Sequence, residues 1–183
     1  MSERDYLSLA LANPDVPWEL HDGRLREKPP MSAEHNALMF ELGYHLRRQL
    51  DPMRFRLRFN AGRLRRPSTA TYIPDVVVIP AALEHEQRRG PGALELYSEP
   101  LPLVVEVWSP STGAYDVDAK FPEYQQRGDH EIWRLHPFER TLRAWRRQSD
   151  GSYIETVYHG GMIEPVALPG VTIDLDELFS LER

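Results

Sequence analysis

Residues 72–79 read YIPDVVVI and residues 102–109 read PLVVEVWS, and these two runs define the centre of the predicted fold. Their apolar residues are continuous rather than alternating, which is typical of strands covered on both faces, as in the middle of an α/β sheet. Strands and a few helices are expected on either side of them along the chain. The sequence therefore predicts a mixed sheet of class α/β or α+β.

The flanking segments are predicted from their hydrophobic periodicity and their turn residues. The predicted elements are a helix over residues 3–12, a hairpin over 18–26 turning at Asp22-Gly23, a helix over 32–50 capped by Ser32, a strand over 54–59, a loop or short helix over 80–99, a helix over 113–127 ended by Gly128, strands over 131–135, 141–147 and 153–158, and a short helix over 175–181. We expect a single domain over residues 1–183, with a core over 17–179 and a short N-terminal helical arm over 1–14.

The composition excludes several classes of protein. With 41% hydrophobic and 27% charged residues, the chain of 183 residues is not a wholly disordered one. It has no cysteine, which excludes disulfides, iron–sulfur ligation and a thiol nucleophile. No apolar run approaches the roughly 18 residues of a membrane span, and the first residues do not read as a secretory signal. We therefore expect a soluble cytoplasmic protein with no membrane partner.

Arginine is far more frequent than lysine in this chain. Of the 22 basic residues, 20 are arginines, and the two lysines are Lys28 and Lys120. A preference for arginine can reflect the base composition of a genome, but it makes each lysine position informative. The net charge of −6 does not favour a general binder of polyanions.

Two carboxylates stand at the ends of the apolar runs. Asp75 begins the first run, and Glu106 lies near the end of the second. If the two strands pair antiparallel, both carboxylates fall on the same edge of the sheet. Two acids in an apolar neighbourhood are costly unless they are paired or bind a cation, and oxygen ligands suit magnesium or manganese. Lys120 is predicted to reach these acids or to pair with Asp116, four residues earlier on the same helix.

At this point the sequence is similar to a known family. The similarity is carried by Tyr72-Ile73-Pro74-Asp75-Val76-Val77-Val78, by residues 102–112 with Glu106-Val107-Trp108-Ser109-Pro110-Ser111-Thr112, and by Asp116-Val117-Asp118-Ala119-Lys120 with Tyr124, Gly128 and Glu131-Ile132-Trp133. These motifs resemble the Uma-two family of restriction endonucleases, part of the PD-(D/E)XK superfamily. The resemblance extends over residues 17–179, including residues 18–25, His35, 168–170 and 175–179.

The resemblance implies a restriction-endonuclease-like fold, with a mixed central sheet flanked by helices, and a metal-dependent DNA endonuclease. It implies that Asp75 and Glu106 bind Mg2+ or Mn2+, with the carbonyl of Val107 as a further ligand, and that Lys120 is the third catalytic residue. The chain departs from the superfamily at Trp108, the usual lysine position, since the family moves this lysine to the following helix. It departs from the family at His136, where an aspartate is common.

Each candidate also has a plain structural interpretation. Asp75 can cap a turn after Pro74, and Glu106 and Lys120 can form a buried ion pair without metal. His35 is either a core histidine or a proton carrier or phosphate contact at the rim of the site. Ser109 is either a turn residue or a minor active-site residue, and Tyr124 is expected to pack against its neighbours.

A row of arginines is the candidate phosphate contact. Arg54, Arg56 and Arg58 lie on one face of the predicted strand over 54–59, and the row continues with Arg63, Arg65 and Arg66. The alternative is a solvated face neutralised by some of the 28 acidic residues. The candidate nucleic-acid-binding residues are thus Arg54, Arg56, Arg58, His35, Ser109 and Tyr124.

Two functions from different classes follow. The first is an endonuclease that hydrolyses phosphodiester bonds in DNA by metal-activated water. The second is a catalytically idle module that binds nucleic acid or assists assembly and keeps the nuclease fold. A homodimer is expected because cutting both strands takes two sites.

Overall fold

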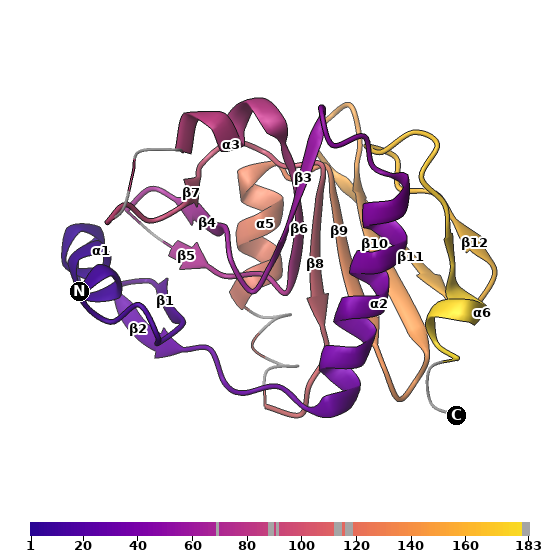
Figure 1. Cartoon of the computed structure of the whole chain (residues 1–183), viewed down its shortest axis with the longest axis horizontal. Helices are drawn as coiled ribbons and strands as arrows, with labels where there is room; N and C mark the ends of the chain where they lie inside the picture. The colour runs from indigo at the N-terminus through magenta and orange to yellow at the C-terminus, as the bar shows by residue number, and fades with distance from the viewer. Residues whose placement is uncertain (69, 88–89, 91, 112–114, 116–118, 181–183) are drawn as a thin grey trace.

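The computed structural model describes residues 1–68, 70–87, 90, 92–111, 115 and 119–180, and a six-stranded sheet forms its centre (Figure 1). The strand order is β11-β10-β9-β8-β6-β3. Only β8 and β9 pair parallel; the other neighbours in this sheet are antiparallel. The strands are β3 (Phe55–Phe59), β6 (Val76–Pro80), β8 (Leu103–Val107), β9 (Glu131–His136), β10 (Thr141–Arg147) and β11 (Tyr153–Tyr158). The prediction of a mixed sheet in an α+β fold is confirmed.

The two apolar runs are neighbouring strands in the middle of this sheet. β6 and β8 pair antiparallel, with Val76 opposite Val105 and Val78 opposite Leu103. Side chains alternate between the faces, so Val76 enters one hydrophobic cluster while Val77 enters another on the opposite face. Both strands are therefore covered on both faces, as their continuous apolar sequence predicted.

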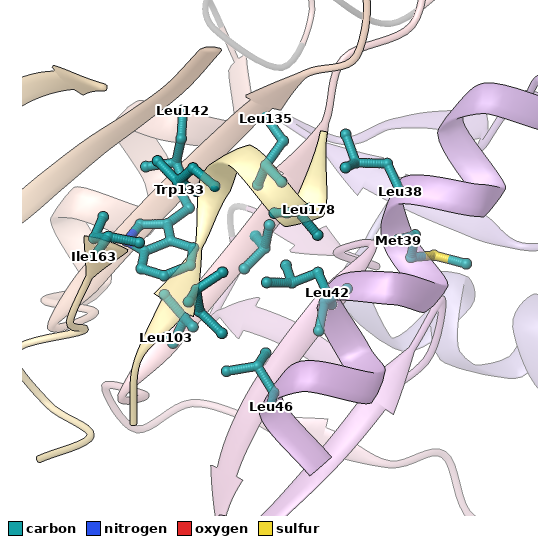
Figure 2. Packing of buried hydrophobic residues seen from close by; sticks show 14 of the residues in the cluster. Leu38, Met39, Leu42, Leu46, Leu103, Trp133, Leu135, Leu142, Ile163 and Leu178 are labelled. Atoms are coloured by element: carbon teal, nitrogen blue, oxygen red, sulfur yellow. The ribbon is translucent and has the colours of Figure 1, made fainter. Parts of the chain in front are cut away.

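Helices α2 (Ala33–Gln49) and α6 (Leu175–Leu178) cover one face of the sheet. The apolar positions of α2 recur at intervals of three and four residues, which places them on a single stripe facing the sheet. Figure 2 shows Leu38, Leu42 and Leu46 of α2 beside Leu178, Leu103, Leu135 and Trp133. This cluster fixes the angle at which α2 crosses the sheet and hence the position of its first turn.

The first turn of α2 is set by a cap. The hydroxyl oxygen of Ser32 accepts a hydrogen bond from the backbone N–H of His35 at 3.2 Å, as the sequence predicted. Further along, a Cβ atom at Gly43 would lie 2.2 Å from the ring of Phe59. Glycine at this position lets α2 approach the edge strand β3.

The opposite face is covered by α5 (Phe121–Arg127) and α3 (Ala81–Gln87). α5 ends at Gly128, whose φ of 81° is the left-handed conformation expected of a helix-ending glycine. The predicted helix over 113–127 is thus observed at its C-terminal part. Residues 112–114 and 116–118, including Asp116, lie outside the described residues.

A second sheet lies beside the first and was predicted only at its hairpin. Its order is β2-β1-β5-β4-β7, with strands β1 (Trp18–His21), β2 (Arg24–Glu27), β4 (Arg63–Arg66), β5 (Ala70–Tyr72) and β7 (Leu96–Tyr97). The helix α1 (Glu3–Ala12) packs against it through Tyr6 and Ala10. Two further strands, β12 (Met162–Ile163) and β13 (Ile173–Asp174), pair with each other.

Two predictions about elements are corrected. The arginines at 63–66 do not continue the strand over 54–59, because β3 and β4 belong to different sheets and the chain turns between them at Gly62, with a φ of 73°. The last helix ends at Leu178 instead of 181. Within the described part of the chain, no helix has the length and hydropathy needed to span a membrane.

Candidate active site

Asp75 and Glu106 meet at the edge of the six-stranded sheet. Each lies one position beyond the pair Val76 and Val105, so the register places the two carboxylates opposite each other. Both are buried, with 2% and 1% of their surface exposed, and both line a cavity of about 10 Å3. The predicted juxtaposition is therefore present, and both carboxylates are buried.

Three donors surround the carboxylate of Asp75. Its Oδ1 lies 2.7 Å from Nζ of Lys28, and its Oδ2 accepts from the backbone N–H of Val107 at 2.7 Å. Nε2 of His35 lies 2.9 Å from the same Oδ2. Burial alone would raise the pKa of Asp75, but the charge of Lys28 and the hydrogen bond from His35 outweigh it and hold the pKa below its ordinary value. Asp75 is therefore ionised.

Glu106 is bound by Tyr124 of α5 and by Lys120, the residue before α5. The hydroxyl of Tyr124 donates to Oε1 of Glu106 at 2.6 Å, and Nζ of Lys120 lies 3.2 Å from the same oxygen. Nζ of Lys120 also lies 3.2 Å from Oε1 of Glu19 on β1, which accepts from the backbone N–H of Ile73 at 2.9 Å. Of the two predicted contacts of Lys120, the one with the acids is present, and the one with Asp116 falls outside the described residues.

Lys28 and Glu19 are site residues that the sequence interpretation missed. The ammonium of Lys28 is bound by three oxygens, from Asn60 at 2.7 Å, the carbonyl of Ile73 at 2.8 Å and Asp75. Lys28 is 6% exposed, so these three oxygens replace most of the water around its ammonium group. The rarity of lysine was the available signal, since both lysines of the chain bind the two candidate carboxylates. Glu19 had no comparable signal.

The cluster combines three carboxylates with two ammonium groups and one imidazole. Asp75, Glu106 and Glu19 are offset by Lys28 and Lys120, and each of these five side chains is at most 6% exposed. Nδ1 of the equally buried His35 has no hydrogen-bond partner among the described residues. A buried ring nitrogen of this kind has capacity for one further polar group.

Trp108 and Ser109 follow the last residue of β8 and have different surroundings. Ser109 is 5% exposed and lines the cavity, and its hydroxyl lies 3.1 Å from that of Ser111. The ring of Trp108 stacks on His136 with 4.2 Å between centroids, and Phe138 meets Trp108 edge-on. Partial burial lowers the pKa of His136, so this ring is an uncharged stacking partner at neutral pH.

The arginines of β3 do not line the cavity. Arg56 lies 3.4 Å from Glu84, and Arg58 lies 3.0 Å from Glu84 and 2.9 Å from Glu95. Both guanidinium groups also donate to backbone carbonyls, those of Phe55 and Leu57, which face away from β6. Of the two interpretations of these arginines, phosphate contact or a face neutralised by acids, the contacts match the second. The guanidinium groups also occupy carbonyls on the free edge of the sheet.

The remaining arginines of the row, Arg54 and those of β4, are exposed or bound to other side chains. Arg54 precedes β3 and is exposed, with its guanidinium over the ring of Phe55. On β4, Arg65 lies 3.3 Å from Glu3, Arg66 pairs with Glu123, and Arg63 donates to the hydroxyl of Tyr6 at 3.2 Å.

Comparison with known proteins assigns the family. The model of the Uma2 family, described as "Putative restriction endonuclease", matches residues 4–176. The fold is similar to the crystal structure of a putative nuclease belonging to DUF820 from Anabaena variabilis, with a TM-score of 0.72 and 18% identity over 89% of each chain. No curated protein matches the sequence. The chain therefore belongs to the Uma2 family.

Proposed function

We propose that this protein is a divalent-metal-dependent endonuclease that hydrolyses phosphodiester bonds in DNA, with Asp75 and Glu106 as its metal ligands. The observation that carries the proposal is the pair of buried carboxylates at facing ends of β6 and β8, each bound by a lysine. Membership in a family described as restriction endonucleases supports nucleic acid as the substrate.

A magnesium or manganese ion fits this donor set. Mg2+ is commonly held by one or two carboxylates and takes its other ligands from water and phosphate. Two acids therefore suffice, although the described residues contain no group of three His, Asp or Glu side chains arranged for a metal. Both oxygens of Asp75 accept hydrogen bonds here, so an ion would exchange with Lys28 at Oδ1. We propose the Val107 carbonyl as a third ligand.

The protein's own groups position these ligands and the reacting phosphate. When bound, the ion would lower the pKa of a water molecule and offset phosphate charge. Lys120 would orient that water and face the charge developing on a phosphoryl oxygen. Tyr124 holds the orientation of Glu106, while His35 holds that of Asp75 and offers Nδ1 to a substrate or solvent group.

Cleavage of labelled oligonucleotides in Mg2+ or Mn2+ tests the proposal. We expect wild-type cleavage to stop when the ions are chelated and to fall by about 100-fold or more in Glu106→Gln. The matched control is Glu155→Gln, which changes an exposed acid on β11 paired with Arg143 and should leave the rate unchanged. Single-stranded DNA, duplex DNA and RNA are compared in parallel, and the mass of the protein in solution tests the expected homodimer.

A second candidate is an idle module that binds nucleic acid or assists assembly. The observation that favours it is the closed, nearly balanced cluster, in which the lysines already offset the carboxylates in a cavity of about 10 Å3. The two candidates differ in one result. An idle module would bind oligonucleotides equally well in wild type and Glu106→Gln and would cleave none of them with either ion.

A further inference from the structure

A larger pocket lies next to the cavity of the buried acids. Its volume is about 490 Å3, and its walls share Lys28, Pro29 and Met31 with the cavity of Asp75 and Glu106. This volume falls within the range of about 300–1,000 Å3 typical of small-molecule sites. The cavity itself has room for about one water-sized group. Of these two spaces, the larger pocket is the one with room for a group as large as a nucleotide base.

The walls of this pocket are largely apolar. Three prolines, Pro17, Pro29 and Pro30, line it together with the thioether of Met31. Proline rings present rigid apolar faces, and a thioether adapts to an aromatic ring and contacts it favourably. A flat aromatic group is the shape that these walls suit best.

The rim of the pocket supplies hydrogen-bonding groups. The side chain of Asn36, in the first turn of α2, has no hydrogen-bond partner among the described residues. Among the described residues, the amide nitrogen of Asn60 donates to two sulfur atoms alone, of Met31 at 3.6 Å and Met39 at 3.3 Å, and sulfur is a weak acceptor. These amides can donate to and accept from the edge of a heterocycle.

The charges around the pocket disfavour a phosphate as its occupant. Glu27 contributes a carboxylate to the lining. The cation of the lining, Lys28, already binds Asp75, Asn60 and the carbonyl of Ile73. An uncharged heterocycle avoids the repulsion that a phosphate would meet from Glu27.

We propose that this pocket is a subsite for one unpaired nucleobase of the substrate, next to the phosphodiester on which Asp75 and Glu106 act. A base inside such a pocket has left the helical stack, so the substrate carries a single-stranded or extruded nucleotide. The choice of a nucleobase rests on the proposed function, while the pocket's shape and charge select a flat, uncharged group.

Methyl NMR of methionine tests the subsite without requiring cleavage. The protein carries 13C-methyl methionine and is titrated with the four deoxynucleoside monophosphates and with deoxyribose 5-phosphate, which lacks a base. We expect the mononucleotides to shift the Met31 methyl signal and deoxyribose 5-phosphate to leave it in place. Met53 and Met162 are exposed and lie outside the pocket, so they serve as internal controls.

A variant pair assigns the hydrogen bonds. Asn36→Ala should weaken mononucleotide binding at Met31 by about five-fold, the effect of one lost hydrogen bond. The matched control is Gln126→Ala, which removes an exposed amide from α5 and should bind as wild type does.

Three results would overturn the subsite. They are a Met31 signal that no mononucleotide moves, an equal response to deoxyribose 5-phosphate, and unchanged binding by Asn36→Ala. Failure of the subsite and failure of the proposed function are distinguishable. Cleavage with an unresponsive Met31 rejects the subsite alone, whereas a responsive Met31 in a protein that cleaves nothing rejects the nuclease alone.

Discussion

The buried cluster around Asp75 and the edge strand β3 both contain several ion pairs, but only the buried cluster is arranged as a site. Its lysines are 6% and 1% exposed and converge on carboxylates from β1, from β8 and from Asp75, the residue before β6. The side chains of Arg56 and Arg58 are 31% and 24% exposed and contact acids and their own strand's carbonyls. Burial and convergence, rather than the number of charges, therefore identify the candidate site in this molecule.

Removing Lys28 should have the largest effect on stability. Lys28→Met leaves Asp75 buried with His35 as its remaining side-chain partner, and breaking a buried pair in this way costs about 3–5 kcal/mol. Urea unfolding of wild type and variant measures the free energy of unfolding. A loss of unfolding free energy below about 1 kcal/mol is typical of a surface pair. It would show that the buried cluster is no more important to stability than the ion pairs of β3.

Acid should weaken the buried cluster through Asp75. Because the folded pKa of Asp75 lies below its unfolded value, its charge stabilises the fold above about pH 4, and this contribution is lost as the pH falls through the folded pKa. Unfolding free energies of wild type and Asp75→Asn are compared from pH 7 to pH 3. We expect the gap between them to narrow below about pH 4. A gap that stays constant would mean that Asp75 has an ordinary pKa.

The hydroxyl of Tyr124 should contribute less than the ammonium of Lys28. Tyr124→Phe removes one hydrogen bond to a charged acceptor, Glu106, at a cost of about 1.5–3 kcal/mol. It should also lower any metal-dependent cleavage, because Glu106 loses a group that fixes its orientation. Urea unfolding and the oligonucleotide assay measure the two effects, and wild-type values in both would show that the hydroxyl is dispensable.

The smallest effect is expected on β3. Arg56→Gln removes a half-exposed pair with Glu84 at 3.4 Å, so we expect a change of about 1 kcal/mol or less. Oligonucleotide affinity, measured by fluorescence anisotropy at two salt concentrations, should stay at the wild-type value. A weaker affinity of Arg56→Gln with a smaller salt dependence would show that Arg56 of β3 contacts phosphate after all.

The sequence predicted the elements whose signals are local. The period of α2, the cap at Ser32, the turn at Asp22-Gly23 and the glycine after α5 are all read within a few residues. The antiparallel pairing of β6 with β8 was a condition that the connection between them allowed, and the structure has it. Most of the second sheet was missed, because strands of two to four residues such as β5 and β7 carry no clear period.

The same reasoning explains which site residues were found. Asp75 and Glu106 end buried strands, so their burial was visible in the local sequence. Lys28 is 47 residues from Asp75 and lies in an irregular segment after β2, where no pattern indicates which partner it meets. The scarcity of lysine is the one sequence signal at Lys28, whereas Lys120 also lies in a motif that resembles the family.

Manganese binding tests the central claim most directly. Calorimetric titration compares wild type with Asp75→Asn, and with Glu155→Gln as the control on the exposed edge strand β11. If Asp75 and Glu106 form a metal site, wild type and Glu155→Gln bind Mn2+ and Asp75→Asn does not. Equal binding by Asp75→Asn, or no binding by wild type with and without a non-cleavable oligonucleotide, would contradict the metal site and leave the cluster as a buried set of ion pairs.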